Sequence, residues 1–418
     1  SAASTTMNIV MVAHFAGTPS YGMVYGHYYL AREWARKGHG VTILAASHAH
    51  TRFRQPTQVE ETIDGIRYRW LKCPRYTPAS SWGRVANILA FTMQVWRNIA
   101  VFDEVDLVIC SSHHPLAIFP SRKLARKHRA KLVFEVRDLW PLTLIELGGA
   151  SRLNPLIAAM QYAENYACKV ADKVVSVLPY ASTYMEEHGM SPDKFLYIPN
   201  GVAIERDEQE PLSQAHRSKL EALKKDGNFL IGYAGRVTLA NALAPAVLAL
   251  AKVSTTLAHL VILGDGALKG ELQGLASRIG VQDRVTFLDP VPKQQVAAFL
   301  SVIDVSYLGL HQTPSLYRFG VSLTKLHDYL LAGKPVICAS DTRVDAIEES
   351  GAGIMCKAGS PEEIAATIDR LAQMPQAECE KLGSKGREWV LRNRDYKVLA
   401  QRFLEGVSDA RALRELRD

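Results

Sequence analysis

Short apolar runs alternate with amphipathic segments along the chain, and this alternation fills both halves. Such runs are typical of parallel strands covered on both faces, and the amphipathic segments between them are typical of crossover helices. In the first half, the predicted strands are Asn8–Ala13, Val41–Ala45, Ile66–Leu71, Leu107–Cys110, Leu132–Glu135, Lys173–Val177 and Phe195–Ile198. In the second half, they are Phe229–Ala234, Leu260–Leu263, Val285–Phe287, Val302–Leu308, Pro335–Cys338 and Gly353–Met355. This order predicts an α/β protein with two doubly wound parallel sheets and right-handed crossovers.

The division between two domains is predicted near the turn PNGV at 199–202. A chain of 418 residues is too long for one ordinary hydrophobic core. Polar, charged sequence follows the turn, which predicts a linker and a capping helix. The predicted parts are a first Rossmann-like domain over 7–203, the linker and capping helix over 204–228, a second Rossmann-like domain over 229–385, and C-terminal helices over 386–418 that return to the first domain.

The composition excludes several classes of protein. An apolar content of 48% and a charged content of 22% are those of a globular protein. Six cysteines are scattered without a CxxC pair, which predicts reduced thiols in a cytoplasmic protein and argues against a disulfide framework or a zinc site. No apolar run approaches twenty residues, so no membrane-spanning helix is predicted. Residues 1–6 are interpreted as preceding a native start at Met7.

The net charge of +7 lies in the first half, where residues 1–200 hold 22 Lys and Arg against 15 Asp and Glu. This excess favours an anionic partner such as a membrane surface, lipid phosphates or nucleic acid, although plain solubility is the better explanation of the charge alone. The segment 82–99 is predicted to be an apolar, weakly basic helix that either packs in the core or lies on a membrane. The loop 51–55 is a second candidate for a lipid or diphosphate contact. No nucleic-acid-binding motif is present.

In doubly wound folds, ligands bind beyond the carboxyl ends of the strands. The loop after the first predicted strand contains Gly22 but no GxGxxG fingerprint, which argues against a nicotinamide or flavin enzyme. His113 and His114 follow a later strand, and they either bind a sugar or acceptor hydroxyl or serve only as loop histidines. Arg137 and Asp138 follow the next strand, and they form either a structural ion pair or part of a site.

The segment 319–337, FGVSLTKLHDYLLAGKPVI, predicts a turn, one short helix, a Gly-Lys-Pro stop and a buried strand. The free N–H groups after Ser322 and the positive end of the helix dipole suit a phosphate. Lys325 adds a cation, and Asp328 lies one turn further on a similar face. These residues are candidates for holding the diphosphate and ribose of a nucleotide; the alternative is an ordinary αβ unit.

The same segment resembles the donor-site helix of glycosyltransferase family 4. The segment Phe134–Gly148, FEVRDLWPLTLIELG, resembles a block of the WbuB-like subgroup, which builds bacterial O-antigen and capsule sugars. The resemblance implies the GT-B fold and retaining transfer of a sugar, such as an N-acetylated deoxyhexose, from a UDP-sugar to a lipid-linked or saccharide acceptor. It also implies that no metal or other cofactor takes part. The expected location is the cytoplasm, with peripheral contact at the inner membrane.

The resemblance also assigns roles in the second domain. Asp328 takes the place of the family's ribose-binding acid, whereas Gly320 stands where the family carries its other glutamate. Arg236 matches an arginine that neutralises the diphosphate. The lysine that often follows it is absent from this chain, and Lys325 is expected to supply the missing charge. Asp265 falls in a G-x-G loop near the nucleotide, although it is equally interpreted as a turn residue.

In the first domain, the resemblance places Gly22 near the donor phosphates. Asp138 is the candidate for contact with the acceptor nucleophile, and Arg137 holds either Asp138 or an acceptor phosphate. Two other functions stay open: a UDP-sugar epimerase on the same fold, which needs no acceptor, and a non-catalytic protein that binds nucleotide sugars without turnover.

Overall fold

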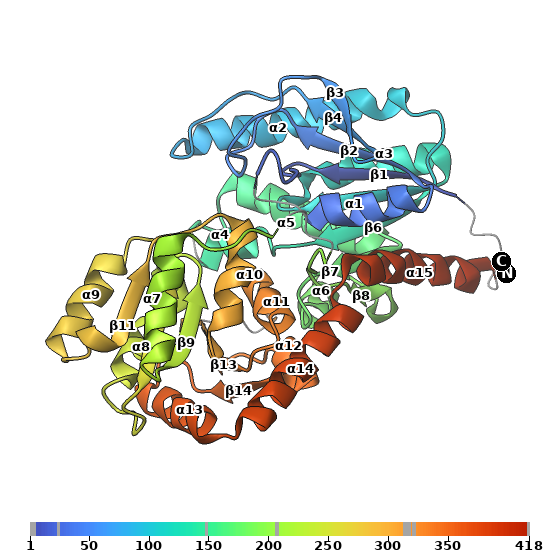
Figure 1. The fold of residues 1–418 in the computed structure, drawn as a ribbon. Helices are drawn as coiled ribbons and strands as arrows, with labels where there is room; N and C mark the ends of the chain where they lie inside the picture. Colours follow the sequence, from blue (N-terminus) through green and yellow to red (C-terminus); the bar gives the residue numbers. More distant parts are fainter. Residues whose placement is uncertain are drawn as a thin grey trace. The chain divides into compact units, whose positions relative to one another are not determined.

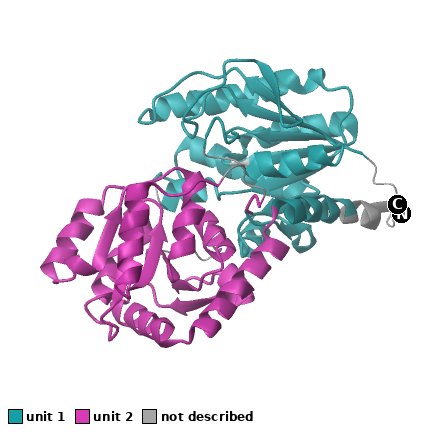
Figure 2. Ribbon diagram, in the orientation of Figure 1, with its two compact units in different colours: residues 1–200, 396–418 teal, residues 201–395 magenta. Residues whose placement is uncertain are grey.

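The computed structural model describes residues 6–22, 26–146, 149–204, 209–311, 319 and 323–415. The chain forms two compact units, which are coloured separately in Figure 2. Unit 1 contains residues 1–200 together with 396–418, and unit 2 contains 201–395. The sequence-based division fell after residue 203 and treated 386–418 as one block, whereas the structure divides that block at Tyr396.

Unit 1 is built on an eight-stranded sheet with the order β3-β4-β2-β1-β5-β6-β7-β8. The strands are β1 (Asn8–Ala13), β2 (Gly40–Ala46), β3 (Glu60–Ile63), β4 (Ile66–Leu71), β5 (Leu107–Ser112), β6 (Lys131–Val136), β7 (Lys173–Ser176) and β8 (Phe195–Tyr197). All neighbours pair in parallel except β3 and β4. Every strand that the sequence predicts in this half is present.

The one strand that the sequence pattern missed is β3, which pairs antiparallel with β4 at the edge of the sheet. Its residues are exposed or half-buried, so they form no apolar run. The turn that joins the two strands is Asp64-Gly65, with φ values of 49° and 81°. An Asp-Gly pair with both φ angles positive is a strong hairpin signal. This dipeptide could therefore have revealed β3.

Helices cover both faces of the unit 1 sheet. They are α1 (Gly26–Arg36), α2 (Ser81–Asn98), α3 (Ile118–His128), α4 (Leu142–Glu146), α5 (Pro155–Val170), α6 (Ser182–Glu187) and α15 (Tyr396–Glu415). Helix α15 packs beside α1 (Figure 1). The buried Trp34 of α1 donates a hydrogen bond to Ala400 O over 2.9 Å and packs against Phe403. Helices α2, α3 and α5 pack in a row on the other face, as right-handed crossovers require.

Unit 2 has a six-stranded parallel sheet with the order β11-β10-β9-β12-β13-β14. The strands are β9 (Phe229–Ala234), β10 (Ala258–Leu263), β11 (Val285–Leu288), β12 (Val305–Gly309), β13 (Val336–Ala339) and β14 (Gly353–Cys356). The helices are α7 (Gln214–Lys225), α8 (Ala244–Ala249), α9 (Lys269–Arg278), α10 (Lys293–Val302), α11 (Thr324–Leu331), α12 (Asp345–Ser350), α13 (Pro361–Gln373) and α14 (Gln376–Asn393). The predicted strand 302–308 begins later, because α10 continues to Val302.

Two hydrophobic clusters fill unit 2, and both draw on its sheet. One gathers Ile231 and Ile262 with α8 and α13, and the other gathers Leu230 and Val261 with α10 and α11. Alternate residues of the same strands thus feed opposite layers, which gives these strands their continuous apolar character. Within the part of the chain that the structure describes, no helix is both long enough and apolar enough to cross a membrane.

Candidate active site

The strand order of unit 1 reverses between β1 and β5, so the loops after these strands diverge at the carboxyl edge of the sheet. A ligand site is expected at such a switch point. The loops after β1, β5 and β6, together with the start of α1, bring His14, His27, His113 and Arg137 to this edge. Four of the sequence-predicted site residues, His113, His114, Arg137 and Asp138, therefore belong to neighbouring loops.

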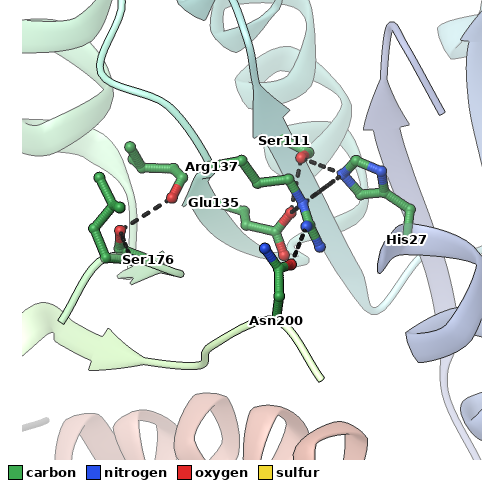
Figure 3. A network of polar contacts seen from close by, with 8 residues as sticks. His27, Ser111, Glu135, Arg137, Ser176 and Asn200 are labelled. Atoms are coloured by element: carbon green, nitrogen blue, oxygen red, sulfur yellow. Dashed lines mark hydrogen bonds and ion pairs between the residues drawn. The ribbon is translucent and has the colours of Figure 1, made fainter. Parts of the chain in front are cut away.

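The carboxylate of Glu135, near the end of β6, is the centre of a buried polar network (Figure 3). Its Oε1 accepts hydrogen bonds from Arg137 Nε and Ser111 Oγ, both over 2.8 Å, and lies 3.3 Å from His27 Nε2. Burial acts to raise the pKa of Glu135. The positive charge of Arg137 and the contacts with His27 and Ser111 outweigh burial and hold this pKa well below its usual range. Glu135 is therefore an ionised anchor at neutral pH.

Arg137 is fixed in place by this network. Its Nε also lies 3.1 Å from His27 Nε2, and its NH1 donates a hydrogen bond to Asn200 Oδ1 over 2.8 Å (Figure 3). A Cβ atom added at Gly26 would lie 2.5 Å from NH1, so the guanidinium requires glycine at the start of α1. Among the described residues, the recorded acidic partner of Arg137 is Glu135, not Asp138.

Sequence reasoning did not select Glu135, His27 or Asn200. A signal for Glu135 was present, because an acidic residue inside the apolar run of β6 is rarely buried without a partner. No local signal identified Asn200, which lies 63 positions from Arg137 in the sequence.

The carboxylate of Asp138 is occupied by its own loop. Oδ1 accepts hydrogen bonds from Leu139 N over 2.9 Å and from Thr143 Oγ1 over 2.8 Å, and Oδ2 accepts one from Trp140 Nε1 over 2.9 Å. The Trp140–Pro141 peptide bond in this loop is cis. These contacts make Asp138 the organiser of the turn that leads into α4. The expected contact with an acceptor stays a prediction.

A chain of hydrogen bonds connects α2 to the loop after β5. Asn87 Nδ2 donates to His48 O and Pro74 O, so its Oδ1 is the acceptor that faces His14 Nε2 over 2.6 Å. His14 Nε2 therefore carries a hydrogen. Burial, together with the nearby His114, Arg52 and His113, lowers the pKa of His14, which is neutral and accepts through Nδ1 from His114 Nε2 over 2.8 Å.

This chain leaves His114 with a lone pair on Nδ1. Burial and the neighbouring His113 lower the pKa of His114 to about 3, so the ring is neutral and Nδ1 has no hydrogen. Among the described residues, His114 Nδ1 has no hydrogen-bond partner, and neither has His113 Nε2. Burial, followed by the proximity of His27 and the positive charge of Arg137, lowers the pKa of His113 to about 3. Two neutral histidines at this edge thus each have one buried ring nitrogen without a hydrogen-bond partner among the described residues.

The loop that carries Gly22 packs against the loop 51–54. Gly22 has a φ of 127°, and a Cβ atom there would lie 2.8 Å from Phe53 N. The buried guanidinium of Arg52 donates hydrogen bonds to Ala16 O and Ala46 O. Arg52 therefore holds the two loops together, and the lipid or diphosphate contact expected for the loop 51–55 stays a prediction.

In unit 2, the corresponding edge gathers the loops after β9 and β10 and the start of α11. Lys325 Nζ donates hydrogen bonds to Tyr233 Oη over 2.8 Å and to Asn241 Oδ1 over 3.1 Å, and lies 4.5 Å from the centre of the Tyr233 ring. Tyr233 Oη in turn donates to Arg236 O over 2.6 Å. Burial lowers the pKa of Lys325 to about 8. Among the described residues, the hydrogen-bond partners of this cation are neutral groups.

The neighbouring residues support this arrangement. Tyr329, one turn after Lys325, accepts a hydrogen bond from Ala234 N over 3.1 Å, so α11 is tied to the end of β9 at two points. The backbone oxygen of Arg236 also accepts from Asn241 Nδ2 over 2.8 Å. The side chain of Arg236 is exposed and has no hydrogen-bond or ion-pair partner within the described ranges. The loop that Tyr233 and Asn241 hold thus carries an exposed, unpaired guanidinium.

The remaining predicted residues of unit 2 lie in turns, on α11 or outside the described residues. A Cβ atom at Gly264 would lie 1.8 Å from Gly235 O, so this glycine serves the packing of two loops. Asp265 is exposed and accepts a hydrogen bond from Gly266 N over 2.8 Å, which is the contact of a turn residue. Asp328 is half-buried on α11, three residues after Lys325. Ser322 and Gly320 lie outside the described residues.

Comparison with known proteins matches both halves of the chain. Residues 22–206 match the family described as Glycosyltransferase Family 4, and residues 216–389 match Glycosyl transferases group 1. Together the two models cover most of the chain, which is a glycosyltransferase with the GT-B fold. Its two Rossmann-like units agree with solved structures: HepE of Anabaena in complex with UDP-glucose superposes with a TM-score of 0.63 at 18% identity, covering 96% of this chain and 100% of that one.

Two curated relatives of this glycosyltransferase come from bacteria. The 2-deoxystreptamine glucosyltransferase of Streptomyces kanamyceticus is 24% identical over 57% of this chain and 59% of its own length, so the match spans less than two thirds of that relative. The GDP-mannose-dependent alpha-(1-6)-phosphatidylinositol monomannoside mannosyltransferase of Mycobacterium tuberculosis is 26% identical over 79% of this chain and 93% of its own length.

For a glycosyltransferase, the geometry separates two kinds of groups. Unit 1 provides buried, neutral histidine nitrogens that suit hydroxyl groups, and unit 2 provides cations that suit phosphate oxygens. Among the described residues, no cluster of His, Cys, Asp or Glu has the arrangement of a metal site.

Proposed function

We propose that this glycosyltransferase transfers a sugar from a nucleoside diphosphate donor, with the donor diphosphate bound in unit 2 beside Lys325 and Arg236. The observation that carries the proposal is the environment of Lys325: a half-buried cation held by the neutral oxygens of Tyr233 and Asn241. A desolvated charge without an internal counter-ion is costly, and an anionic ligand relieves that cost.

The chemical step requires stabilisation of a departing diphosphate. The bond between the anomeric carbon and the diphosphate oxygen breaks with its electron pair on that oxygen, and the acceptor oxygen forms the new bond to the anomeric carbon. Cations that are already in place stabilise the growing negative charge. We propose that Lys325, Arg236 and the start of α11 do this without a metal ion. The departing phosphate takes the acceptor proton, which is the arrangement expected for retention of configuration.

On this proposal, the edge of unit 1 serves the sugar and the acceptor. His113 Nε2 and His114 Nδ1 are the nitrogens proposed to meet hydroxyl groups. Arg137 acts as a positioning residue, because its guanidinium is committed to Glu135 and Asn200. Asp328 is proposed to contact the ribose.

We propose that the donor is a UDP-sugar. The structure of HepE contains UDP-glucose, which supports this choice, while the GDP-mannose dependence of the mycobacterial relative makes GDP the main competitor. The WbuB-like block over Phe134–Gly148 supports an acceptor in surface polysaccharide synthesis, lipid-linked or saccharide, and an N-acetylated deoxyhexose as the sugar. With a lipid-linked acceptor, the proposed place of the reaction is the cytoplasmic face of the inner membrane.

The first test is calorimetric binding of UDP, GDP, ADP and uridine to the full chain, with and without EDTA. We expect UDP to bind most tightly, uridine much more weakly, and EDTA to have no effect. Tighter binding of GDP would change the donor class, and binding of uridine as tight as that of UDP would remove the phosphate role of Lys325 and Arg236.

The second test is turnover of UDP-sugars with and without lipid-linked acceptors. Release of UDP only in the presence of an acceptor supports transfer, and the anomeric configuration of the product reports retention. Interconversion of the donor sugar without an acceptor would identify an epimerase instead, and UDP binding without any turnover would identify a binding protein.

A further inference from the structure

The outer face of α2 carries an exposed apolar stripe. Trp82, Leu89, Met93 and Trp96 are 86%, 53%, 52% and 38% exposed. Their spacing places them on one side of the helix, opposite Asn87, Ile88, Phe91 and Val95, which are buried. No acidic residue occurs between Ser81 and Asn98. Helix α2 is therefore apolar on both sides, although only one side packs against unit 1.

Helix α3, which packs beside α2, supplies positive charge at the end of this stripe. Arg122, Lys123, Arg126 and Lys127 form two i,i+4 rows, and α3 contains no acidic residue. Lys123 Nζ lies 5.2 Å from the centre of the Trp96 ring. Lys123, Arg126 and Lys127 are exposed. The cations therefore lie beside the apolar stripe and not on a separate part of the surface.

A pocket of about 650 Å³ opens between α2, α3 and α5. It is lined by Trp96, Phe119, Arg122, Lys123, Arg126, Lys127 and Tyr166. The rings of Phe119, Tyr162 and Tyr166 form a cluster in which each ring contacts the other two, and Tyr162 is 66% exposed. Arg122 lies over the Tyr166 ring at 5.2 Å. The pocket thus combines aromatic walls with four cations and no carboxylate among its lining residues.

The basic end of this pocket lies away from the candidate active site. Helices that follow parallel strands run back toward the amino ends of those strands. Trp96, Lys127 and Tyr166 lie in the last turns of α2, α3 and α5, so they lie toward the amino edge of the sheet. The Glu135 network and the histidines lie at the carboxyl edge.

We propose that this face of unit 1 is a docking surface for an anionic lipid bilayer, in which α2 lays Trp82, Leu89, Met93 and Trp96 into the interfacial region and the basic pocket binds a lipid phosphate. An apolar stripe with aromatic residues beside a basic, acid-free helix has the composition of an interfacial membrane helix. Clustered cations are attracted to anionic lipid headgroups. Binding of a free phosphate ion would not explain the exposed apolar stripe. Binding of another protein would not by itself explain why the cations lie beside the stripe without any acidic residue.

The experiment is co-sedimentation of the full chain with vesicles of phosphatidylcholine, alone or mixed with phosphatidylglycerol, without nucleotide. We expect binding to the mixed vesicles that weakens as salt is raised. The double variant Met93→Gln/Lys127→Gln is expected to lower the partition coefficient by about tenfold, of which the lost cation accounts for about fivefold. The matched control is Arg152→Gln/Leu153→Gln, which removes one exposed cation and one exposed apolar side chain at the other end of α5 and should bind like the wild type.

Two further measurements keep the proposal falsifiable. Bromine-labelled lipids should quench Trp82 and Trp96, so the variants Trp82→Phe and Trp96→Phe should each lose part of the quenching. Inorganic phosphate and soluble glycerophosphate are tested by calorimetry, and their binding without vesicle binding would identify an anion site and overturn the bilayer proposal. Absent vesicle binding, or equal losses in the control variant, would overturn it as well. Calorimetric UDP binding should be the same in all these variants, which separates this proposal from the donor site.

Discussion

The two carboxyl edges treat positive charge in opposite ways. In unit 1, Arg137 is neutralised by the buried Glu135 and fixed further by Asn200. In unit 2, Lys325 is held by the neutral oxygens of Tyr233 and Asn241, and burial lowers its pKa to about 8. The charge of Arg137 is thus neutralised inside unit 1, whereas the described partners of Lys325 are neutral. On the proposed function, Arg137 positions neighbouring groups and Lys325 binds the anionic diphosphate.

The largest effect is expected from Glu135→Gln, which keeps the shape of the side chain but removes the counter-charge of Arg137. Loss of one partner of a buried ion pair costs about 3–5 kcal/mol. Denaturant unfolding at neutral pH should show a loss of this size. The matched control is Glu388→Gln, whose exposed ion pair with Arg392 is expected to contribute little. Equal stability of the two variants would mean that the Glu135 network is not an internal anchor.

The pH dependence of this effect has a definite sign. The pKa of Glu135 is below its ordinary value of 4.5 in the folded protein. Its contribution to stability is therefore fully present above about pH 4.5 and is lost as the pH falls toward the folded-state pKa. The stability difference between the wild type and Glu135→Gln should shrink below that pH. A difference that stays constant down to the acid transition would contradict the ionised state of this carboxylate.

The opposite result is expected for Lys325→Met, which removes a half-buried charge that has no counter-ion within the described part of the chain. UDP binding should weaken by about 1.5–3 kcal/mol, the range for hydrogen bonds to charged groups, while uridine binding stays the same. Unfolding stability at neutral pH should not fall, because the lysine is itself desolvated in the free protein. A loss of stability like that of Glu135→Gln would mean that Lys325 is structural and would remove the contrast between the two edges.

The pKa of Lys325 predicts how this site responds to pH. Because the folded-state pKa of about 8 lies below the ordinary value of 10.5, the unfolded chain binds more protons between these values, and stability rises with pH there. UDP affinity of the wild type should fall above about pH 8, as the ammonium loses its proton. Lys325→Arg stays charged and should bind UDP without this decline. A wild-type affinity that is flat up to pH 10 would contradict the assignment.

The strands were predictable from sequence because a strand covered on both faces is a continuous run of apolar residues, as in β1 and β9. The location of His113, Arg137 and Lys325 near strand or helix ends also followed from local sequence. Their partners did not, because Arg137 meets Asn200 and Lys325 meets Tyr233 only after distant segments have packed. For the same reason, Asp138 was a plausible partner of Arg137 from adjacency, whereas packing gives that place to Glu135.

A smaller effect is expected from Asp138→Asn. The amide can keep the bonds to one oxygen, but its NH₂ group cannot accept from Trp140 Nε1. We expect a stability loss of about 1–2 kcal/mol, unchanged UDP binding and reduced transfer through displacement of α4. The same change at the exposed turn residue Asp265 serves as the control and should leave stability nearly unchanged. Full activity with the expected stability loss would confine Asp138 to a structural role.

The smallest effect is expected from Arg236→Ala, because this guanidinium is exposed to solvent and its charge is screened. UDP binding should weaken by less than about 1 kcal/mol, and the difference from the wild type should diminish as salt is raised. Arg278→Ala, which removes an exposed arginine from α9, is the matched control and should not change UDP binding. If Arg236→Ala weakens UDP binding as much as Lys325→Met does, bound UDP must remove water from Arg236 as fully as from Lys325. Diphosphate binding would then depend on the exposed Arg236 as much as on the half-buried Lys325.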